Sequence, residues 1–275
     1  MQIHETIASL RAARKGAGRV ALVPTMGNLH AGHIALMTQA SQQADSVIAT
    51  IFVNRLQFRP GEDFEKYPRT FAEDCAKLEA AGVAHLFAPD EAEMYPVPQT
   101  YHIEVPPDQA GVLDGEFRPG HFCGVATVVM KLFQIAQPDI AFFGKKDYQQ
   151  LMVIRNMVRD FNLPIDIIGG ETVRAADGLA LSSRNSYLTE SERSEAPRMF
   201  RLLSELAGAV RAGAQDYFAL EKLVVSGLKA NGWAPDYVAL RKKLDLQLPS
   251  VHESGLVVLA AARLGSTRLI DNLEV

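Results

Sequence analysis

The first 170 residues alternate short apolar runs with longer amphipathic stretches. The apolar runs lack a strict alternation of polar and apolar positions, which is typical of parallel strands buried on both faces of a sheet. They predict strands over residues 19–25, 46–53, 85–89, 139–144 and 164–173. The stretches between them predict helices up to residue 14 and over residues 33–44, 70–82, 124–138 and 147–162. This alternation predicts an α/β fold with a doubly wound parallel sheet.

The pattern changes after the polar segment 177–189. Residues 190–213 and 217–232 predict two helices, and residues 235–242 and 255–275 predict a few antiparallel strands. We therefore expect two domains, one over residues 1–174 and a smaller α+β domain over residues 175–275. The boundary should lie between Arg174 and Asp177.

Composition and charge are those of an ordinary globular protein. Of the 275 residues, 48% are hydrophobic and 22% charged, and the net charge of −4 gives no reason to expect nucleic-acid or membrane binding. No apolar run approaches the roughly 20 residues that span a membrane, and no signal-peptide core follows Met1. Cys75 and Cys123 lie in apolar contexts without metal-type spacing, so we expect them to be reduced and buried. These features predict a soluble cytoplasmic protein.

Candidate chemistry begins in the stretch "PTMGNLHAGHIALM", residues 24–37, directly after the first predicted strand. The usual phosphate-binding signatures are missing. No GxGxxG follows the strand, and the GK pair of "FFGKKD" (142–147) lacks the upstream glycine and the hydroxyl residue of a P-loop. If this domain binds a nucleotide, other residues must contact its phosphates.

The two histidines of that stretch, His30 and His33, have three possible interpretations: a metal site, packing, or phosphate binding. A metal would need a third ligand, but no HExxH frame, carboxylate or cysteine lies nearby. A lone histidine is more often structural than functional. Position favours phosphate, because open α/β sheets bind ligands where a strand ends and a helix begins. Gly27 and Gly32 allow close backbone approach, and imidazoles can donate hydrogen bonds to phosphate oxygens.

The segment HAGH is similar to the HIGH motif of nucleotidyltransferases that activate a carboxylate with ATP. Five further blocks follow in the sequence: "FVNRLQF" (52–58), "YPRT" (67–70), "HFCGVATVVMKLFQIAQPD" (121–139), "FFGKKDYQQL" (142–151) and "DGLALSSRNSYL" (177–188). In this order and spacing the set strongly resembles the pantothenate synthetase (pantoate–beta-alanine ligase) family. The resemblance implies a Rossmann-like domain over residues 1–174 that binds nucleotide and pantoate. It also implies a lid domain over residues 175–275.

The later blocks also have a physical interpretation. "SSRN" offers hydroxyls and one arginine after a glycine-containing turn, and it is similar to the loop that closes over triphosphate in this superfamily; otherwise it is a polar linker. Lys146 can touch phosphate as a point charge, and Asp147 is of a residue type that suits an N-cap. The amides of Gln57 and Gln150 suit the hydroxyls of a small hydroxy acid, unless they only hydrate the surface.

The resemblance assigns a role to each matching position. His30, His33 and Lys146 are implied as catalytic residues that contact the phosphates of ATP. The implied ATP-binding residues are Met26, Gly27, His33, Gly144, Lys146, Asp147, Val173, Leu181, Ser182, Ser183 and Arg184. The implied pantoate-binding residues are Met26, Asn54, Gln57 and Gln150. No protein metal ligand is implied, and Mg²⁺ accompanies the ATP phosphates.

Two positions depart from the family pattern. Arg55 stands where proline usually follows the asparagine, and Lys145 stands where an acidic residue usually precedes the site lysine. We expect both to add positive charge near the cleft.

The activity implied is that of an ATP-binding ligase in pantothenate and coenzyme A biosynthesis. Pantoate is condensed with beta-alanine through a pantoyl adenylate, releasing AMP and pyrophosphate, in a homodimeric cytoplasmic enzyme. Two alternatives remain open: a nucleotidyltransferase that makes a stable dinucleotide, and a nucleotide-binding regulatory module without turnover.

Overall fold

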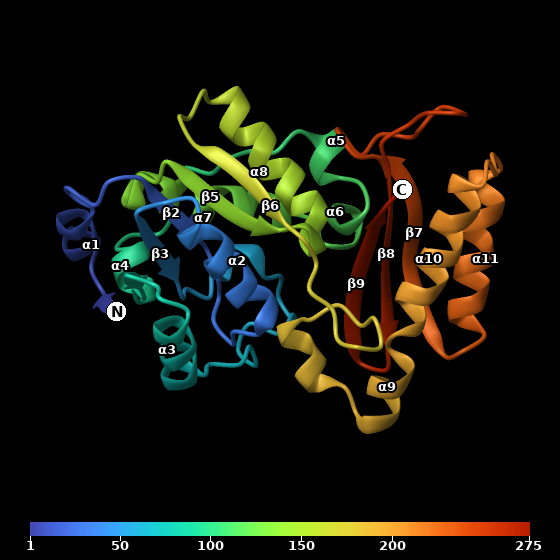
Figure 1. Ribbon diagram of the computed structural model, residues 1–275, viewed down its shortest axis with the longest axis horizontal. Helices are drawn as coiled ribbons and strands as arrows, with labels where there is room; N and C mark the ends of the chain where they lie inside the picture. Colours follow the sequence, from blue (N-terminus) through green and yellow to red (C-terminus); the bar gives the residue numbers. More distant parts are fainter.

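A computed structural model describes residues 1–275 and arranges them around two sheets (Figure 1). The first sheet is parallel throughout, as the unbroken apolar runs predict. Its strands, in spatial order, are β1 (Gln2–His4), β4 (His85–Phe87), β3 (Ser46–Thr50), β2 (Val20–Val23), β5 (Ile140–Gly144) and β6 (Asp166–Gly170). Strands β3 and β4 lie on one side of β2, and the later strands β5 and β6 lie on its other side. The order of the strands therefore reverses between β2 and β5, and ligands bind at such a reversal in open α/β sheets.

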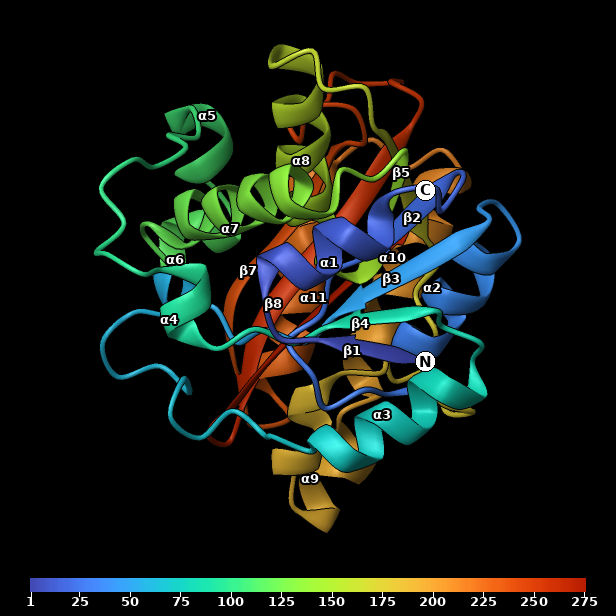
Figure 2. The same cartoon turned by 90° about the vertical axis from the view of Figure 1, so that its left-hand side faces the viewer.

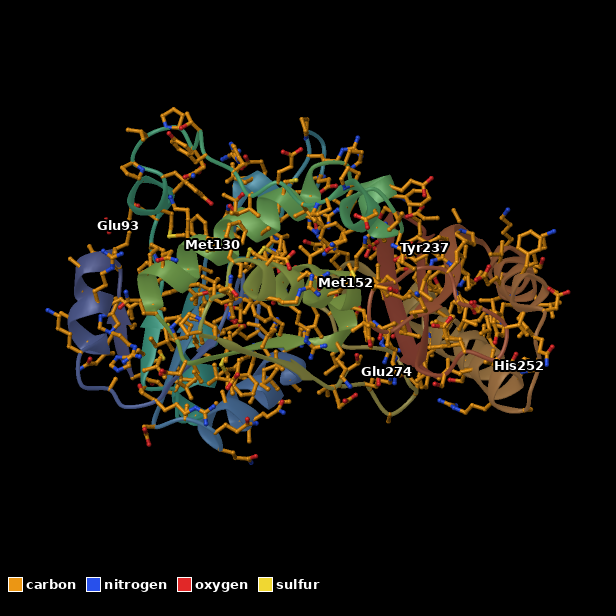
Figure 3. All side chains as sticks on the ribbon, turned by 90° about the horizontal axis from the view of Figure 1, so that it is seen from above. Glu93, Met130, Met152, Tyr237, His252 and Glu274 are labelled. Carbon is orange, nitrogen blue, oxygen red and sulfur yellow. The ribbon has the colours of Figure 1, made fainter.

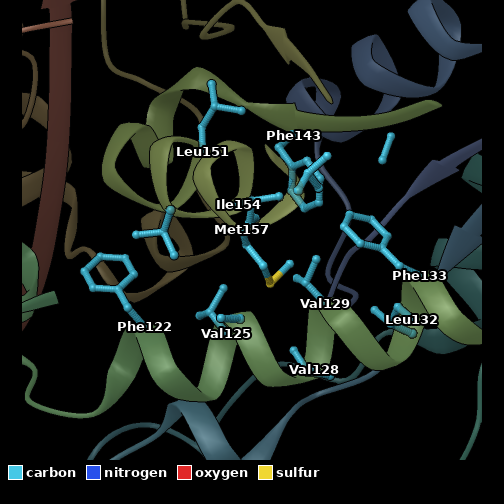
Figure 4. Close-up of a cluster of buried hydrophobic side chains, with 14 of the residues drawn as sticks. Phe122, Val125, Val128, Val129, Leu132, Phe133, Phe143, Leu151, Ile154 and Met157 are labelled. Carbon is cyan, nitrogen blue, oxygen red and sulfur yellow. The ribbon is translucent and has the colours of Figure 1, made fainter. Parts of the chain in front are cut away.

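Helices cover both faces of this sheet (Figure 2). On one face lie α1 (Ile7–Arg14), α7 (His121–Ala136) and α8 (Tyr148–Asp160). On the other lie α2 (Ala31–Ser41) and α3 (Phe71–Ala80). Figure 4 shows Phe122, Val125 and Val129 of α7 directed toward Ile154 and Met157 of α8. Shorter helices, α4 (Glu91–Met94), α5 (Pro107–Ala110) and α6 (Asp114–Phe117), lie in the connection before α7.

The second sheet is antiparallel and packs on both of its faces. Its strands, in order, are β7 (Trp233–Lys242), β8 (Leu256–Leu264) and β9 (Thr267–Glu274). Because side chains alternate along a strand, Val257 and Leu259 of β8 join the core formed with α7 and α8. Val258 and Ala260 face instead the core formed with α10 (Arg198–Arg211) and α11 (Tyr217–Lys229). The sheet is thus sandwiched between the first layer and its own helices.

The structure confirms the fold class and the ten predicted elements of the first 173 residues, and differs in four details. The helix expected over residues 190–213 is divided into α9 (Glu190–Glu195) and α10, because Pro197 between them has no N–H to donate. Helix α7 begins at His121, three residues before the expected start. The edge strand β1 and the short helices α4, α5 and α6 were not expected, since three or four residues are too few to show a period. Cys75 and Cys123 are free but only partly buried.

No helix combines the length and the apolar character needed to cross a membrane.

Candidate active site

The loop that follows β2 is held by a buried carboxylate from α3. Gly27 and Asn28 both have positive φ angles, 84° and 51°, so the chain turns sharply before α2. The N–H groups of Asn28 and Leu29 donate to the carboxylate of Asp74, at 2.8 and 2.7 Å, and only 1% of Asp74 is exposed. Lys77 donates to the carbonyl of Leu29 at 2.8 Å. These contacts fix the direction in which α2 enters the cleft.

His30 and His33 each use their Nδ1 atom to cap the start of α2. The N–H of Gly32 donates to Nδ1 of His30 at 3.1 Å, and the N–H of His30 donates to Nδ1 of His33 at 3.3 Å. An Nδ1 atom that accepts a hydrogen bond carries no proton, so each neutral ring is protonated at Nε2. The two rings stack with centroids 4.0 Å apart, and both residues line the cleft. A structural role and phosphate binding are therefore compatible, because Nδ1 accepts a backbone hydrogen bond at the start of the helix while Nε2–H remains free to donate to a ligand.

The surroundings keep both imidazoles neutral. Burial, and then the positive charge of Lys146, lower the pKa of His30 to about 4. Burial, and then the proximity of His30, lower the pKa of His33 to about 3. At neutral pH the pair therefore offers two uncharged donors.

Lys146 supplies the free positive charge at this end of the cleft. It follows β5 in a short 3₁₀ turn, Lys145–Asp147, and its ammonium makes no ion pair or hydrogen bond with the protein. Asp147 occupies the N-cap position of α8, but its side chain makes no capping hydrogen bond, so that part of the expectation is wrong. Because the ammonium of Lys146 forms no ion pair within the protein, its charge is available to an anion.

The segment Ser182–Arg184 lies against the histidine loop. Ser183 Oγ donates to the carbonyl of Asn28 at 3.1 Å. The guanidinium of Arg184 forms two hydrogen bonds, of 3.0 and 3.1 Å, with the carboxylate of Asp63. The loop is docked by polar contacts, and its arginine lies at the rim of the same cleft.

The other end of the cleft is apolar and carries the amide side chains of Gln57 and Gln150. Asn54 is 1% exposed and donates to Gln57 Oε1 at 3.2 Å, while Gln57 Nε2 lies 3.2 Å from the sulfur of Met26. Gln150 makes no hydrogen bond within the protein, so its amide is free for a ligand. The apolar wall here consists of Phe52, Val125, Val128, Val129, Leu132 and Phe143.

The structure brings almost all the expected site residues together. They line one cavity of about 220 Å³, with the exception of Gly27, which supports the turn beneath it. A second cavity, of about 520 Å³, lies between the two sheets and shares Lys146, Asp147, Gln150, Ser182 and Arg184 with the first. The cleft thus has a charged end, an apolar end, and a wide opening beside both.

The two departures from the family pattern add no free charge to the cleft, contrary to expectation. Arg55 pairs with Glu65 at 3.5 Å and with Glu91 at 3.1 Å. Lys145 pairs with Glu171 and with Glu274, the latter at 3.4 Å. Neither basic residue lines the cavities.

Several residues of the site lie in the sequence blocks that carry the resemblance but had no role assigned to them. Tyr67 lines the cleft and is 6% exposed. Gly124 lets α7 approach the 3₁₀ turn Arg55–Gln57, because a Cβ atom there would lie 2.2 Å from the carbonyl oxygen of Leu56. His121 Nδ1 lies 2.9 Å from the carbonyl oxygen of Gln57. No group of three or more His, Cys, Asp or Glu residues could hold a metal ion.

Comparison with known proteins gives consistent matches over the whole chain. Residues 2–274 match the family model described as pantoate-beta-alanine ligase. A pantothenate synthetase of Neisseria meningitidis is 58% identical over 100% of this chain and 99% of its own. The crystal structure of pantothenate synthetase from Thermus thermophilus superposes with a TM-score of 0.95 at 44% identity, covering 100% of this chain and 99% of that one.

A third relative carries ligands. A pantoate-beta-alanine ligase from Francisella tularensis, described as complexed with beta-gamma ATP and beta-alanine, has a TM-score of 0.85 at 34% identity. The match covers 100% of this chain and 97% of that one.

Proposed function

This chain belongs to the pantoate–beta-alanine ligase family, and we propose that it condenses pantoate with beta-alanine in two ATP-dependent half-reactions. The observation that supports this most directly is the division of the cleft. Neutral donors and cations gather at one end, and two amides on an apolar wall lie at the other. The first end suits a triphosphate and the second a small branched hydroxy acid.

In the first half-reaction, a carboxylate oxygen of pantoate attacks the α-phosphorus of ATP. Pantoyl adenylate forms, and the bond to pyrophosphate breaks. The Nε2–H groups of His30 and His33 donate to phosphate oxygens as charge develops, and Lys146 neutralises part of that charge. Because the imidazoles are neutral and already held by the helix, they need no reorganisation when the substrate reacts. Ser182, Ser183 and Arg184 contact the departing pyrophosphate.

In the second half-reaction, the amine of beta-alanine attacks the acyl carbon and AMP leaves with one carboxylate oxygen. No side chain needs to form a covalent bond, because adenylation has supplied the leaving group. Gln57 and Gln150 hold the pantoyl oxygens, with Asn54 and Met26 beside them, and positioning provides much of the rate enhancement. The wider cavity shares Lys146 and Gln150 with the reaction cleft and is the route we assign to the incoming amine.

The remaining ATP contacts follow the same arrangement. We assign the nucleoside to the part of the cleft formed by Gly144, Val173 and Leu181, with Gly27 supporting the phosphate loop and Asp147 beside the phosphates. We propose that residues 1–174 bind ATP and pantoate, and that residues 175–275 contribute the lid.

Mg²⁺ is proposed to enter with the nucleotide as part of the substrate. The ion favours phosphate oxygens and water with one or two carboxylates, and the residues here provide no larger ligand set. We also propose a homodimer, on the family resemblance, and a cytoplasmic location, with which the two free cysteines agree.

The experiment is pyrophosphate exchange. Radiolabelled pyrophosphate should enter ATP only when pantoate is present, and beta-alanine should not be required. Exchange without pantoate would favour a different acceptor. A stable adenylylated product that beta-alanine does not consume would favour a dinucleotide-forming transferase, and ATP binding without exchange would favour a regulatory module.

A further inference from the structure

One side chain of the second sheet holds the backbone of the Lys146 turn. Asn272 lies on β9 and is 6% exposed. Its Nδ2 group donates to the carbonyl oxygens of Lys145 and Lys146, at 2.9 and 2.8 Å. A side-chain amide offers two N–H donors, so both are used on two consecutive peptide groups.

The position of the Lys146 side chain depends on that turn. Its ammonium has no partner in the protein, so no contact of its own directs it into the cleft. Gly144, two residues before it, is the last residue paired in the β5–β6 ladder. In the turn between this ladder and helix α8, the hydrogen bonds from the Asn272 side chain hold the carbonyl groups of Lys145 and Lys146.

Asn272 is itself held firmly. The N–H of Asn272 donates to the carboxylate of Asp271 at 2.8 Å. That carboxylate receives two hydrogen bonds from Arg174, at 2.7 and 2.9 Å, and Arg174 also donates to the carbonyl of Asn272 at 3.1 Å. Figure 3 shows the neighbouring Glu274 where β9 meets the first layer, and Glu274 accepts a hydrogen bond from Tyr148 at 2.9 Å. This end of β9 is therefore a fixed support for the turn.

We propose that Asn272 is a positioning residue for the first half-reaction, because it fixes the backbone from which Lys146 reaches the phosphates of ATP. This inference rests on the proposed function of Lys146. Asn272 is not the only side chain that joins the second sheet to the first layer. Arg268 of β9 forms an ion pair with Asp114 of α6 at 2.7 Å and another with Asp236 of β7 at 2.7 Å. A loss of Asn272 should therefore disturb the turn more than the assembly of the two layers.

The test is a double-mutant cycle measured by pantoate-dependent pyrophosphate exchange. Asn272→Ala should slow exchange by about 10- to 100-fold, since a displacement of about 1 Å at a reacting group has effects of this size. It should raise the KM for ATP and leave the KM for pantoate unchanged. In a Lys146→Ala background, the same substitution should cause little further loss. Asn272→Ser keeps one donor and should recover part of the rate.

The matched control is Asn156→Ala, which removes a 2.9 Å amide hydrogen bond from α8 to Gln109 away from the cleft. It should exchange like the wild type. If Asn272→Ala does not fold, Asn272→Ser alone and with Lys146→Ala gives the same comparison. Equal losses in both backgrounds, or equal rises in the two KM values, would overturn the positioning role. A wild-type protein without pantoate-dependent exchange would overturn the proposed function as well.

Discussion

His30 is assigned two roles, a helix cap and a hydrogen-bond donor, and three substitutions at this position can separate them. Nδ1 of His30 caps helix α2, and Nε2–H is free for phosphate. Asparagine places an oxygen near the position of Nδ1, and glutamine places an amide nitrogen near the position of Nε2. The His30→Asn variant would therefore retain the cap without the donor, and the His30→Gln variant would retain the donor without the cap. Alanine provides neither.

The expected magnitudes differ for the two functions. Loss of an N-cap acceptor destabilises a protein by about 0.5–2 kcal/mol, and loss of a donor to developing charge slows a reaction by about 10²–10³-fold. His30→Ala should show both losses. His30→Asn should unfold in urea like the wild type but exchange pyrophosphate as slowly as the alanine variant. His30→Gln should recover part of the exchange rate while remaining less stable than the wild type.

Urea unfolding and pantoate-dependent exchange, measured on the same preparations, give the comparison. Restoration of the exchange rate in His30→Asn would contradict the two roles of His30, since the Nε2–H donor would then be unnecessary. Proportional losses of stability and rate in all three variants would also contradict them, since one structural role would explain both.

Three further predictions address other parts of the site. Gln57→Ala should weaken pantoate binding by about 1–3 kcal/mol while ATP binding is nearly unchanged, as calorimetry with each substrate would measure; equal weakening contradicts the assignment. Gly124→Ala, whose Cβ atom would lie 2.2 Å from the carbonyl oxygen of Leu56, should displace the Gln57 turn and raise the KM for pantoate more than that for ATP. Arg184→Ala should slow adenylate formation but not amine attack on preformed adenylate, and single-turnover measurements in which only the amine step slows would exclude this role.

The pH dependence of stability has a defined sign. Since burial lowers the pKa of His33 to about 3, below the unfolded value near 6.5, the unfolded chain binds more protons between these values. The contribution of His33 to the free energy of unfolding is therefore fully present above pH 6.5 and decreases as the pH falls toward 3. The free energy of unfolding of the wild type, relative to that of His33→Gln, should therefore decrease as the pH is lowered from about 7 to about 4.5. A difference independent of pH would contradict a neutral, buried imidazole.

Local patterns in the sequence were sufficient for the longer strands and helices of the first layer of the fold. Buried parallel strands and amphipathic helices have periods that can be read within a few residues, and His30 and His33 lie at a recognisable strand-to-helix junction. Pro197 shows the limit of this approach, because the apolar spacing continues across it while its missing N–H ends the helix hydrogen bonds.

The supports of the site were much harder to predict. Asp74 lies 46 residues from Asn28, the group it holds. Its only local signal was a carboxylate four residues before buried Leu78, on the inner face of α3. Asn272 had no local signal, because its partners belong to the other sheet. The charge expected from Lys145 was wrong for the same reason, since Glu274 lies far away in the sequence.

The transfer of oxygen from pantoate to AMP would show directly whether the carboxylate of pantoate is adenylated. Pantoate labelled with ¹⁸O in its carboxylate is incubated with ATP and beta-alanine, and the products are analysed by mass spectrometry. An adenylate intermediate requires that one labelled oxygen leave with AMP for each amide bond formed. Label in inorganic phosphate, with ADP as the nucleotide product, would indicate an acyl phosphate and contradict the mechanism. Unlabelled AMP would show that the carboxylate never attacked the α-phosphorus.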